Sequence, residues 1–296
     1  MTYGSGNTIV ALDYNTFAQG GSSVSHSTAN INSVWGVGSG DKGYGQASVL
    51  PTVAGGTDTV TATQWASLIN TLNSTLTHQS GSGSGISATT AGTTINYLST
   101  LSTNINNAYT NRLNASTTGT KVVGSTITPA AFTAVNQPAA STFSLSRTVT
   151  FASGDAARYF FNAGGSINFV IATATNNDGS SRSGDLVTLL NTNLSAVNGF
   201  KYNAGGTIAG SGGTVNTNST ATGYYSLTTS AQTIAQITAT GTYAGDYVQL
   251  TVQSNGVQGS NADTGSILTF TLNIYSAART RSEEHTSELQ SPMYLV

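Results

Sequence analysis

Apolar residues at helical spacing mark two segments in the first third of the chain. After Thr61 they recur every three or four residues, which places them in one stripe along a helix. The members of this first stripe are Trp65, Leu68, Ile69, Leu72 and Leu76. The second stripe, close to a heptad, consists of Ile95, Leu98, Leu101, Ile105, Tyr109 and Arg112. A shorter helix is predicted over residues 12–19. Both stripes are narrow, so we expect them to pair with each other or with copies from neighbouring chains.

Beyond residue 140 the hydrophobic period changes to two, which is typical of strands with one buried face. Alternation predicts strands at residues 143–151, 167–171, 248–252 and 268–274. One helix interrupts them, with Ser183 as its predicted N-cap, and its apolar positions are Leu186, Leu189, Leu190, Leu194 and Val197. The predicted fold class is therefore α+β: an N-terminal helical segment, then a β-rich domain that resembles an antiparallel sandwich and carries one or two short helices.

Four segments follow from this change of period. Residues 1–113 form the helical region, which has Gly-rich loops and is predicted to dock or oligomerise. Residues 114–141 are rich in Thr, Ala and Pro and read as a linker, and residues 142–280 form the β-rich domain. Residues 281–296 have a different composition, because they contain all three Glu of the chain.

This last segment resembles the in-frame translation of a sequencing adapter. The resemblance covers the residues from Arg281 to Ser291. The alternative is a genuine capped helix, since Ser282 precedes Glu283 and Glu284. We expect the segment to be non-native and leave it out of the functional argument.

Charge is scarce in the remaining 280 residues. The full chain of 296 residues has a net charge of -2 and 7% charged residues, whereas about 25% is usual. Setting aside Arg281 and the three Glu leaves eight Lys and Arg and eight Asp. A neutral chain with no basic cluster is not expected to bind nucleic acid. No run approaches the roughly 18 apolar residues of a membrane span, and no Cys is present for disulfides or thiolate chemistry.

Candidate catalytic and cofactor motifs are weak. Residues 38–43 match G-x-G-x-x-G, but no apolar strand precedes them and no helix follows. His26 and His78 lack ligand partners at metal spacing. No Glu precedes residue 283, and the eight Asp are scattered along the chain, so the paired carboxylates needed for glycan hydrolysis are not expected. We expect no enzyme activity, cofactor or metal. Arg158 is expected to pair with Asp155 or a backbone carbonyl rather than grip an external anion.

Surface recognition is the one binding activity with support from the residues. Flat aromatic faces beside Asn and Gln suit sugar binding, and the candidate contacts are Tyr224, Tyr225, Tyr243 and Tyr247. The alternative interpretation, which we favour, is that these side chains form cross-strand aromatic pairs that hold the sheet.

Short tracts along residues 1–275 carry a family resemblance. In the first half they are Asp13-Tyr14-Asn15, Gly43-Tyr44-Gly45-Gln46, Thr61-Ala62-Thr63-Gln64-Trp65 and His78-Gln79. In the second half they are Ala157-Arg158-Tyr159-Phe160-Phe161-Asn162-Ala163-Gly164-Gly165 and Gly223-Tyr224-Tyr225-Ser226-Leu227-Thr228. In order and spacing the chain resembles virion structural proteins of tailed phages, especially cyanophages and other marine phages with contractile, T-even-like tails. One departure is Ala66, where relatives usually have Asn.

The resemblance implies a non-catalytic virion component of the tail, a tail fibre or the neck, assembled in the host cytoplasm. Its expected partners are other copies of itself and other virion proteins, joined through polar surfaces and the apolar helix stripes. One alternative is a fibre module that binds a receptor or a host surface glycan. A second is an extracellular S-layer or adhesin-like protein, which would need an export signal that residues 1–12 do not provide.

Overall fold

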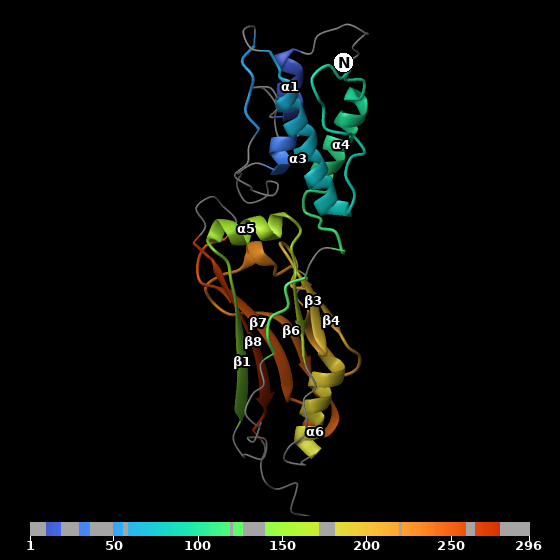
Figure 1. The fold of residues 1–296 in the computed structure, drawn as a ribbon. Coiled ribbons are helices and arrows are strands. Elements are labelled where there is room, and N and C mark those ends of the chain that lie inside the picture. Colours follow the sequence, from blue (N-terminus) through green and yellow to red (C-terminus); the bar gives the residue numbers. More distant parts are fainter. Residues whose placement is uncertain are drawn as a thin grey trace, which may run out of the picture.

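The computed structural model describes residues 10–18, 30–35, 50–55, 59–118, 121–126, 140–171, 181–218, 221–258 and 264–278. The adapter-like segment 281–296 and the glycine pattern at 38–43 lie outside these residues. The described chain has a helical part and a β-rich part, which lie end to end (Figure 1). Each part has its own cluster of buried apolar side chains.

Four helices form the helical part. They are α1 (Ala11–Ala18), α2 (Ile31–Trp35), α3 (Ala62–Ser80) and α4 (Leu98–Thr110). Helix α3 begins at a capping box, in which Thr61 accepts from the backbone N–H of Gln64 and the Gln64 side chain accepts from that of Thr61. It ends at Gly81, whose φ of 85° is the left-handed conformation that favours glycine.

The two apolar stripes meet inside the chain. Leu68 and Leu72 of α3 and Leu101 of α4 are all 0% exposed and belong to one buried cluster. Of the two arrangements expected, the structure has the pairing of the stripes with each other. The buried members of both stripes are therefore covered within the chain and are not open to a second copy, whereas Leu76, Ile95 and Tyr109 are only half-buried.

Two antiparallel sheets form the β-rich part. The larger sheet has the order β1 (Ser141–Thr150), β8 (Ile267–Ser276), β7 (Tyr247–Ser254), β6 (Gln232–Thr238) and β5 (Thr214–Asn218). The smaller one has the order β2 (Ile167–Val170), β3 (Ala196–Phe200) and β4 (Thr207–Ala209). All strand pairs are antiparallel.

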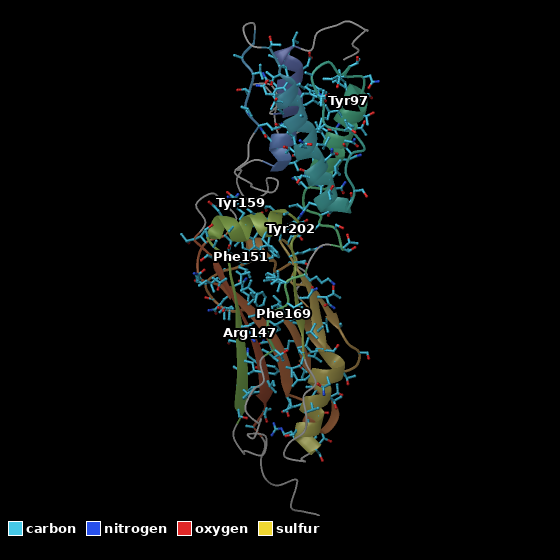
Figure 2. The ribbon with its side chains drawn as sticks, viewed as in Figure 1. Tyr97, Arg147, Phe151, Tyr159, Phe169 and Tyr202 are labelled. Carbon is cyan, nitrogen blue, oxygen red and sulfur yellow. The ribbon has the colours of Figure 1, made fainter. Side chains whose placement is uncertain are left out.

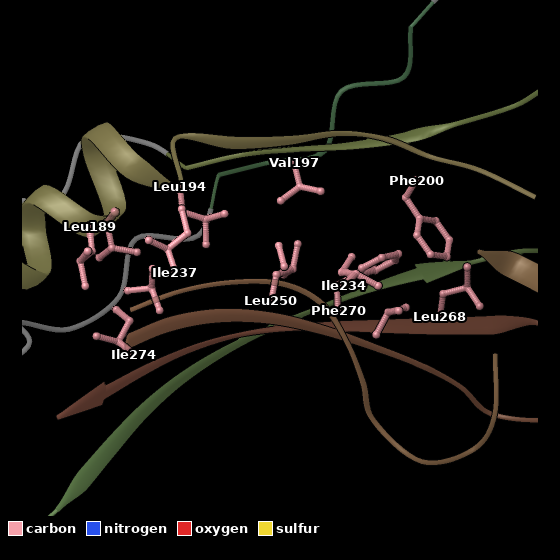
Figure 3. Close-up of a cluster of buried hydrophobic side chains, with 14 of the residues drawn as sticks. Leu189, Leu194, Val197, Phe200, Ile234, Ile237, Leu250, Leu268, Phe270 and Ile274 are labelled. Atoms are coloured by element: carbon pink, nitrogen blue, oxygen red, sulfur yellow. The ribbon is translucent and has the colours of Figure 1, made fainter. Parts of the chain in front are cut away.

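The sheets pack face to face over an aromatic and aliphatic core. Phe169 of β2 and Phe200 of β3 lie 4.2 and 5.3 Å from Phe270 of β8, between ring centroids (Figure 2). Figure 3 shows this layer, with Val197 and Phe200 facing Leu250 and Phe270. The α+β fold class, with a sandwich of antiparallel sheets after the helices, is confirmed.

Two helical segments close the sandwich. Helix α5 (Gly154–Asn162) lies across the end nearest the helical part, and α6 (Ser181–Thr188) lies toward the opposite end (Figure 1). The single helix predicted from Ser183 to Val197 is partly wrong. Ser183 lies inside α6, the chain continues as a π-helix, η1 (Leu189–Asn193), and Val197 already belongs to β3. Two 3₁₀ turns, η2 (Tyr224–Ser226) and η3 (Gly241–Tyr243), precede and follow β6.

The end of α3 contacts the end of α5. The His78 Nε2 atom lies 2.8 Å from the carbonyl oxygen of Ala163, and the Ser116 N–H donates to the His78 carbonyl at 2.7 Å. Gly164, with φ of 80°, lies so close to the backbone at Leu113 that a Cβ atom there would sit 2.5 Å from the Leu113 oxygen. Glycine is therefore required at this contact between the two parts.

Candidate functional site

The outer face of the larger sheet carries hydroxyl, amide and tyrosine side chains without a charged group among its described residues. These residues alternate along each strand with the buried core positions. We call this surface the neutral face. Its members are Thr142, Ser144, Ser146 and Thr148 of β1; Thr269, Thr271, Asn273 and Tyr275 of β8; Tyr247, Gln249, Thr251 and Gln253 of β7; and Thr233, Gln236 and Thr238 of β6.

Side-chain hydrogen bonds run across the strands of the neutral face. Ser144 Oγ donates to Asn273 Oδ1 at 2.7 Å. The Gln249 amide donates at 2.9 Å both to Gln236 Oε1 and to Thr233 Oγ1. These bonds hold the amides in fixed orientations, so the face is polar, rigid and electrically neutral.

One pair of candidate tyrosines is structural. Tyr224 is 0% exposed and stacks on Phe161 of α5 with ring centroids 4.4 Å apart. Its hydroxyl donates to the Gly154 oxygen at 3.4 Å, and the hydroxyl of Tyr225 donates to Asn162. Tyr224 therefore cannot present a face to a glycan, which corrects its candidate role: these rings attach η2 to α5.

The other pair lies where β6 connects to β7, at the end of the sheet opposite to Tyr224. Tyr243 lies in η3 and packs partly against the sandwich core. Tyr247 lies on the neutral face and stacks on Tyr275, with centroids 4.5 Å apart and ring planes inclined by 19°. The four candidates thus do not form one site. Tyr275 is a member of the stack that was not among the sequence candidates, although its alternation with Asn273 along a predicted strand places both on one face.

A buried ion pair joins two elements of the β-rich part. Arg182 of α6 holds Asp246 through two hydrogen bonds of 2.7 Å, from Nε to Oδ2 and from Nη2 to Oδ1, and both side chains are buried. Asp246 Oδ1 also accepts from the Ala277 N–H at 2.9 Å, and Arg182 donates to the Ala277 oxygen. This cluster, which we call the clamp, ties α6 to the start of β7 and the end of β8.

Arg158 shows the predicted pairing with Asp155. Its Nη2 atom lies 2.8 Å from Asp155 Oδ1, and its guanidinium lies 4.8 Å from the ring centroid of Tyr159. Asp13 accepts from the Val10 N–H at 3.1 Å at the start of α1. These carboxylates have structural partners, and within the described ranges no three His or acidic side chains gather as a metal site would require.

Two open hollows lie outside the neutral face. One, of about 600 Å³, lies where the helical part meets the smaller sheet, and Lys201 is the only charged residue among those that line it. Gln79 also lines it, and its Nε2 donates to the Ala108 oxygen at 2.7 Å. The other, of about 420 Å³, lies beside Tyr97, which accepts from Trp65 Nε1 at 3.0 Å. Neither hollow brings an acid and a base together among its lining residues.

Comparisons with protein-family models, with curated proteins and with solved structures give no match. Among the described helices, none combines the length and the hydropathy needed to cross a bilayer. Among the described surfaces, the neutral face combines a regular array of polar side chains with the absence of charge.

Proposed function

We propose that this chain is a non-catalytic structural component of a tailed-phage particle, located in the tail, a tail fibre or the neck. The observation that carries the proposal is the neutral face, a rigid sheet surface of hydroxyls and amides without charge. Two such surfaces can approach without electrostatic repulsion, and their contacts would depend little on salt. The short tracts that resemble those of virion proteins support the particle context.

The proposed role is mechanical. The sandwich supplies a stiff body, because its core is continuous between the sheets and its two ends are fixed by α5 and by the clamp. The expected partners are other copies of this chain and other virion proteins. The protein would be made in the host cytoplasm and incorporated into the virion there.

Particle proteomics tests this role. Particles of a phage that carries the gene are purified on a density gradient and compared with the infected-cell lysate by quantitative mass spectrometry. We expect the chain to be enriched in particles to the level of known tail proteins, and the phage DNA polymerase serves as the control that should be depleted. A chain that is abundant in the lysate but depleted from particles would contradict the proposal.

A second candidate function is glycan binding at a host surface. The Tyr247–Tyr275 stack favours it, because the pair lies on the neutral face two residues along the strands from the amides of Gln249 and Asn273. Replacing Tyr247 with Ser should abolish binding to host cells and lower the melting temperature by only a few degrees, because one aromatic stack is lost. Thr269→Ala on the same face should change neither binding nor melting temperature. Binding that survives Tyr247→Ser would exclude this site.

A further inference from the structure

Strand β1 is a long edge of the larger sheet. It pairs with β8 along ten residues without a register shift, from Ser141 opposite Ser276 to Thr150 opposite Ile267. No described strand lies on its other side, since the sheet order begins with β1 (Figure 1). The question is what pairs with this edge.

The pairing geometry shows which backbone groups point outward. The Phe151 N–H donates to the Ser266 oxygen at 2.9 Å, one step beyond the last β1–β8 pair. In an antiparallel ladder, hydrogen-bonded pairs alternate with pairs that are not bonded. The odd-numbered residues of β1 therefore bond to β8, and the even-numbered residues direct their N–H and C=O groups away from it. The even-numbered residues are Thr142, Ser144, Ser146, Thr148 and Thr150.

These outward groups are accessible. All five even-numbered residues are exposed. Within the part of the chain that the structure describes, their backbone N–H groups have no protein partner. Five donors and five acceptors thus stand in a row, the arrangement on which another strand can add.

Protective features of other edges are missing from β1. Natural sheet edges are usually short, bulged, or carry Pro and charged residues. The opposite edge, β5, has five residues and a register irregularity between Val215 and Thr217, while β2 and β4 have four and three residues. In contrast, β1 has one charge, Arg147, and its guanidinium donates to Ser125 of the same chain (Figure 2).

The sequence of β1 has a similar pattern of residue types in both directions. From residue 142 to residue 150 it is Thr-Phe-Ser-Leu-Ser-Arg-Thr-Val-Thr, so the pairs at equal distances from Ser146 are Thr with Thr, Phe with Val, and Ser with Thr. The fourth pair, Leu145 with Arg147, differs in chemical character. An antiparallel pair of two identical strands places equidistant residues opposite each other, which means that β1 complements a second copy of itself.

We propose that β1 pairs antiparallel with β1 of a second copy, with Ser146 on the two-fold axis, and joins two larger sheets into one continuous sheet. This inference rests on the self-assembly in the proposed function and names its surface. Two bonds for each of five residue pairs give about ten backbone hydrogen bonds, a number typical of a specific interface. The neutral face would then extend unbroken across both chains.

This register would also bury apolar side chains on the inner side of β1. Phe143 comes to lie opposite Val149 of the second copy, in the closely spaced kind of pair. Both side chains are half-buried in the single chain and would lose further exposed apolar area. Leu145 lies opposite Arg147, so no two arginines are directly opposed, and the arginine stem can cover the leucine.

Charge placed across the interface tests the register. In the full chain, Ser144→Lys with Thr148→Lys brings like charges directly opposite at two places, whereas Ser144→Lys with Thr148→Glu brings opposite charges together there. In sedimentation velocity we expect the wild-type chain to be a dimer. The dimer dissociation constant should rise about tenfold or more in the double-lysine variant and should equal that of the wild type in the lysine–glutamate variant. Ser102→Lys with Asn106→Lys, on the exposed side of α4, is the control for added charge and should remain dimeric.

A distance between the two copies is a second measurement, and it is feasible because the chain has no Cys, so a label attaches only to an introduced one. A spin label at Ser146→Cys should give a distance between chains below about 20 Å, because the labelled positions flank the two-fold axis at strand spacing. A monomeric wild-type chain, or an oligomer in which the double-lysine variant is as tight as wild type, would overturn the pairing of β1. Such an oligomer would leave the structural role intact, since the particle experiment decides that role independently.

Discussion

The buried clamp should make the stability of the sandwich depend on one ion pair. Asp246 is 0% exposed and Arg182 is 6% exposed, and two hydrogen bonds of 2.7 Å join them. Removing one partner of a buried pair typically costs about 3–5 kcal/mol, because the other charge stays in a low-dielectric site without its counter-charge. Asp246→Asn keeps an acceptor for the Ala277 N–H, so its cost should lie near 3 kcal/mol.

The expected change is large enough to measure by heat or urea. For a part of this size, about 3 kcal/mol corresponds to a fall of roughly 10 °C in melting temperature. Far-UV circular dichroism of the β signal reports the sandwich. Both tryptophans of the chain precede the sandwich in sequence, and Trp65 belongs to the buried cluster of the helical part, so tryptophan fluorescence should change little.

A double-variant cycle separates the ion pair from other effects. Asp246→Asn and Arg182→Met should each destabilise, and the double variant should cost clearly less than their sum, since it leaves no opposite charge behind. Lys201→Met removes one positive charge from an exposed site and should stay within about 0.5 kcal/mol of wild type. An Asp246→Asn variant as stable as Lys201→Met would refute the reasoning, and so would strictly additive costs.

Two further substitutions test the glycine contact and the helical core. Gly164→Ala should prevent the contact between the helical and β-rich parts, so a protease should cleave the chain there faster than in the wild type. Gly92→Ala is the control: Gly92 has a similar φ of 86° but open space around it, so the substitution should lower the free energy of unfolding by only about 1 kcal/mol. Burial raises the pKa of the Tyr14 hydroxyl above its ordinary value of 10.0. Because the folded state favours the neutral form, stability should be fully present below pH 10 and fall as the pH rises further. Tyr14→Phe should flatten this fall in unfolding followed by Trp65 fluorescence, and an unchanged pH slope would contradict the assignment.

Elements with an uninterrupted period were predictable from sequence, and those with a local irregularity were not. Helix α3 has an unbroken stripe, and β1 and β8 alternate regularly along ten residues each. In β6, Ile234 and Ala235 are neighbours and both are buried, because a register shift after Thr233 breaks the alternation. The π-helix η1 changes the helical period in the same way, which explains why the predicted helix extended too far.

The candidate site was harder to predict because it depends on register. Tyr247 and Tyr275 meet only because their strands pair in one alignment, and neither residue signals the other locally. Arg182 and Asp246, 64 positions apart, likewise meet through the tertiary fold alone. Tyr224 is a candidate glycan contact by sequence, whereas its burial against Phe161 gives it a structural role that no local pattern signals.

The low charge of the larger sheet affects how many copies can join edge to edge. Because the sheet carries almost no charge, electrostatic repulsion cannot stop the addition of further copies, so the number must be limited by the structure of the sheet edges. If both edges of the larger sheet were open, pairing would continue into a fibre. The short, irregular β5 closes one edge, while β1, whose hydroxyl and apolar positions are arranged about Ser146, would pair with a second copy at the other. Such a pair uses the open edge of each chain, so β1 pairing would stop at two copies. Contacts with any other proteins of the proposed particle would then use the neutral face rather than the strand edges.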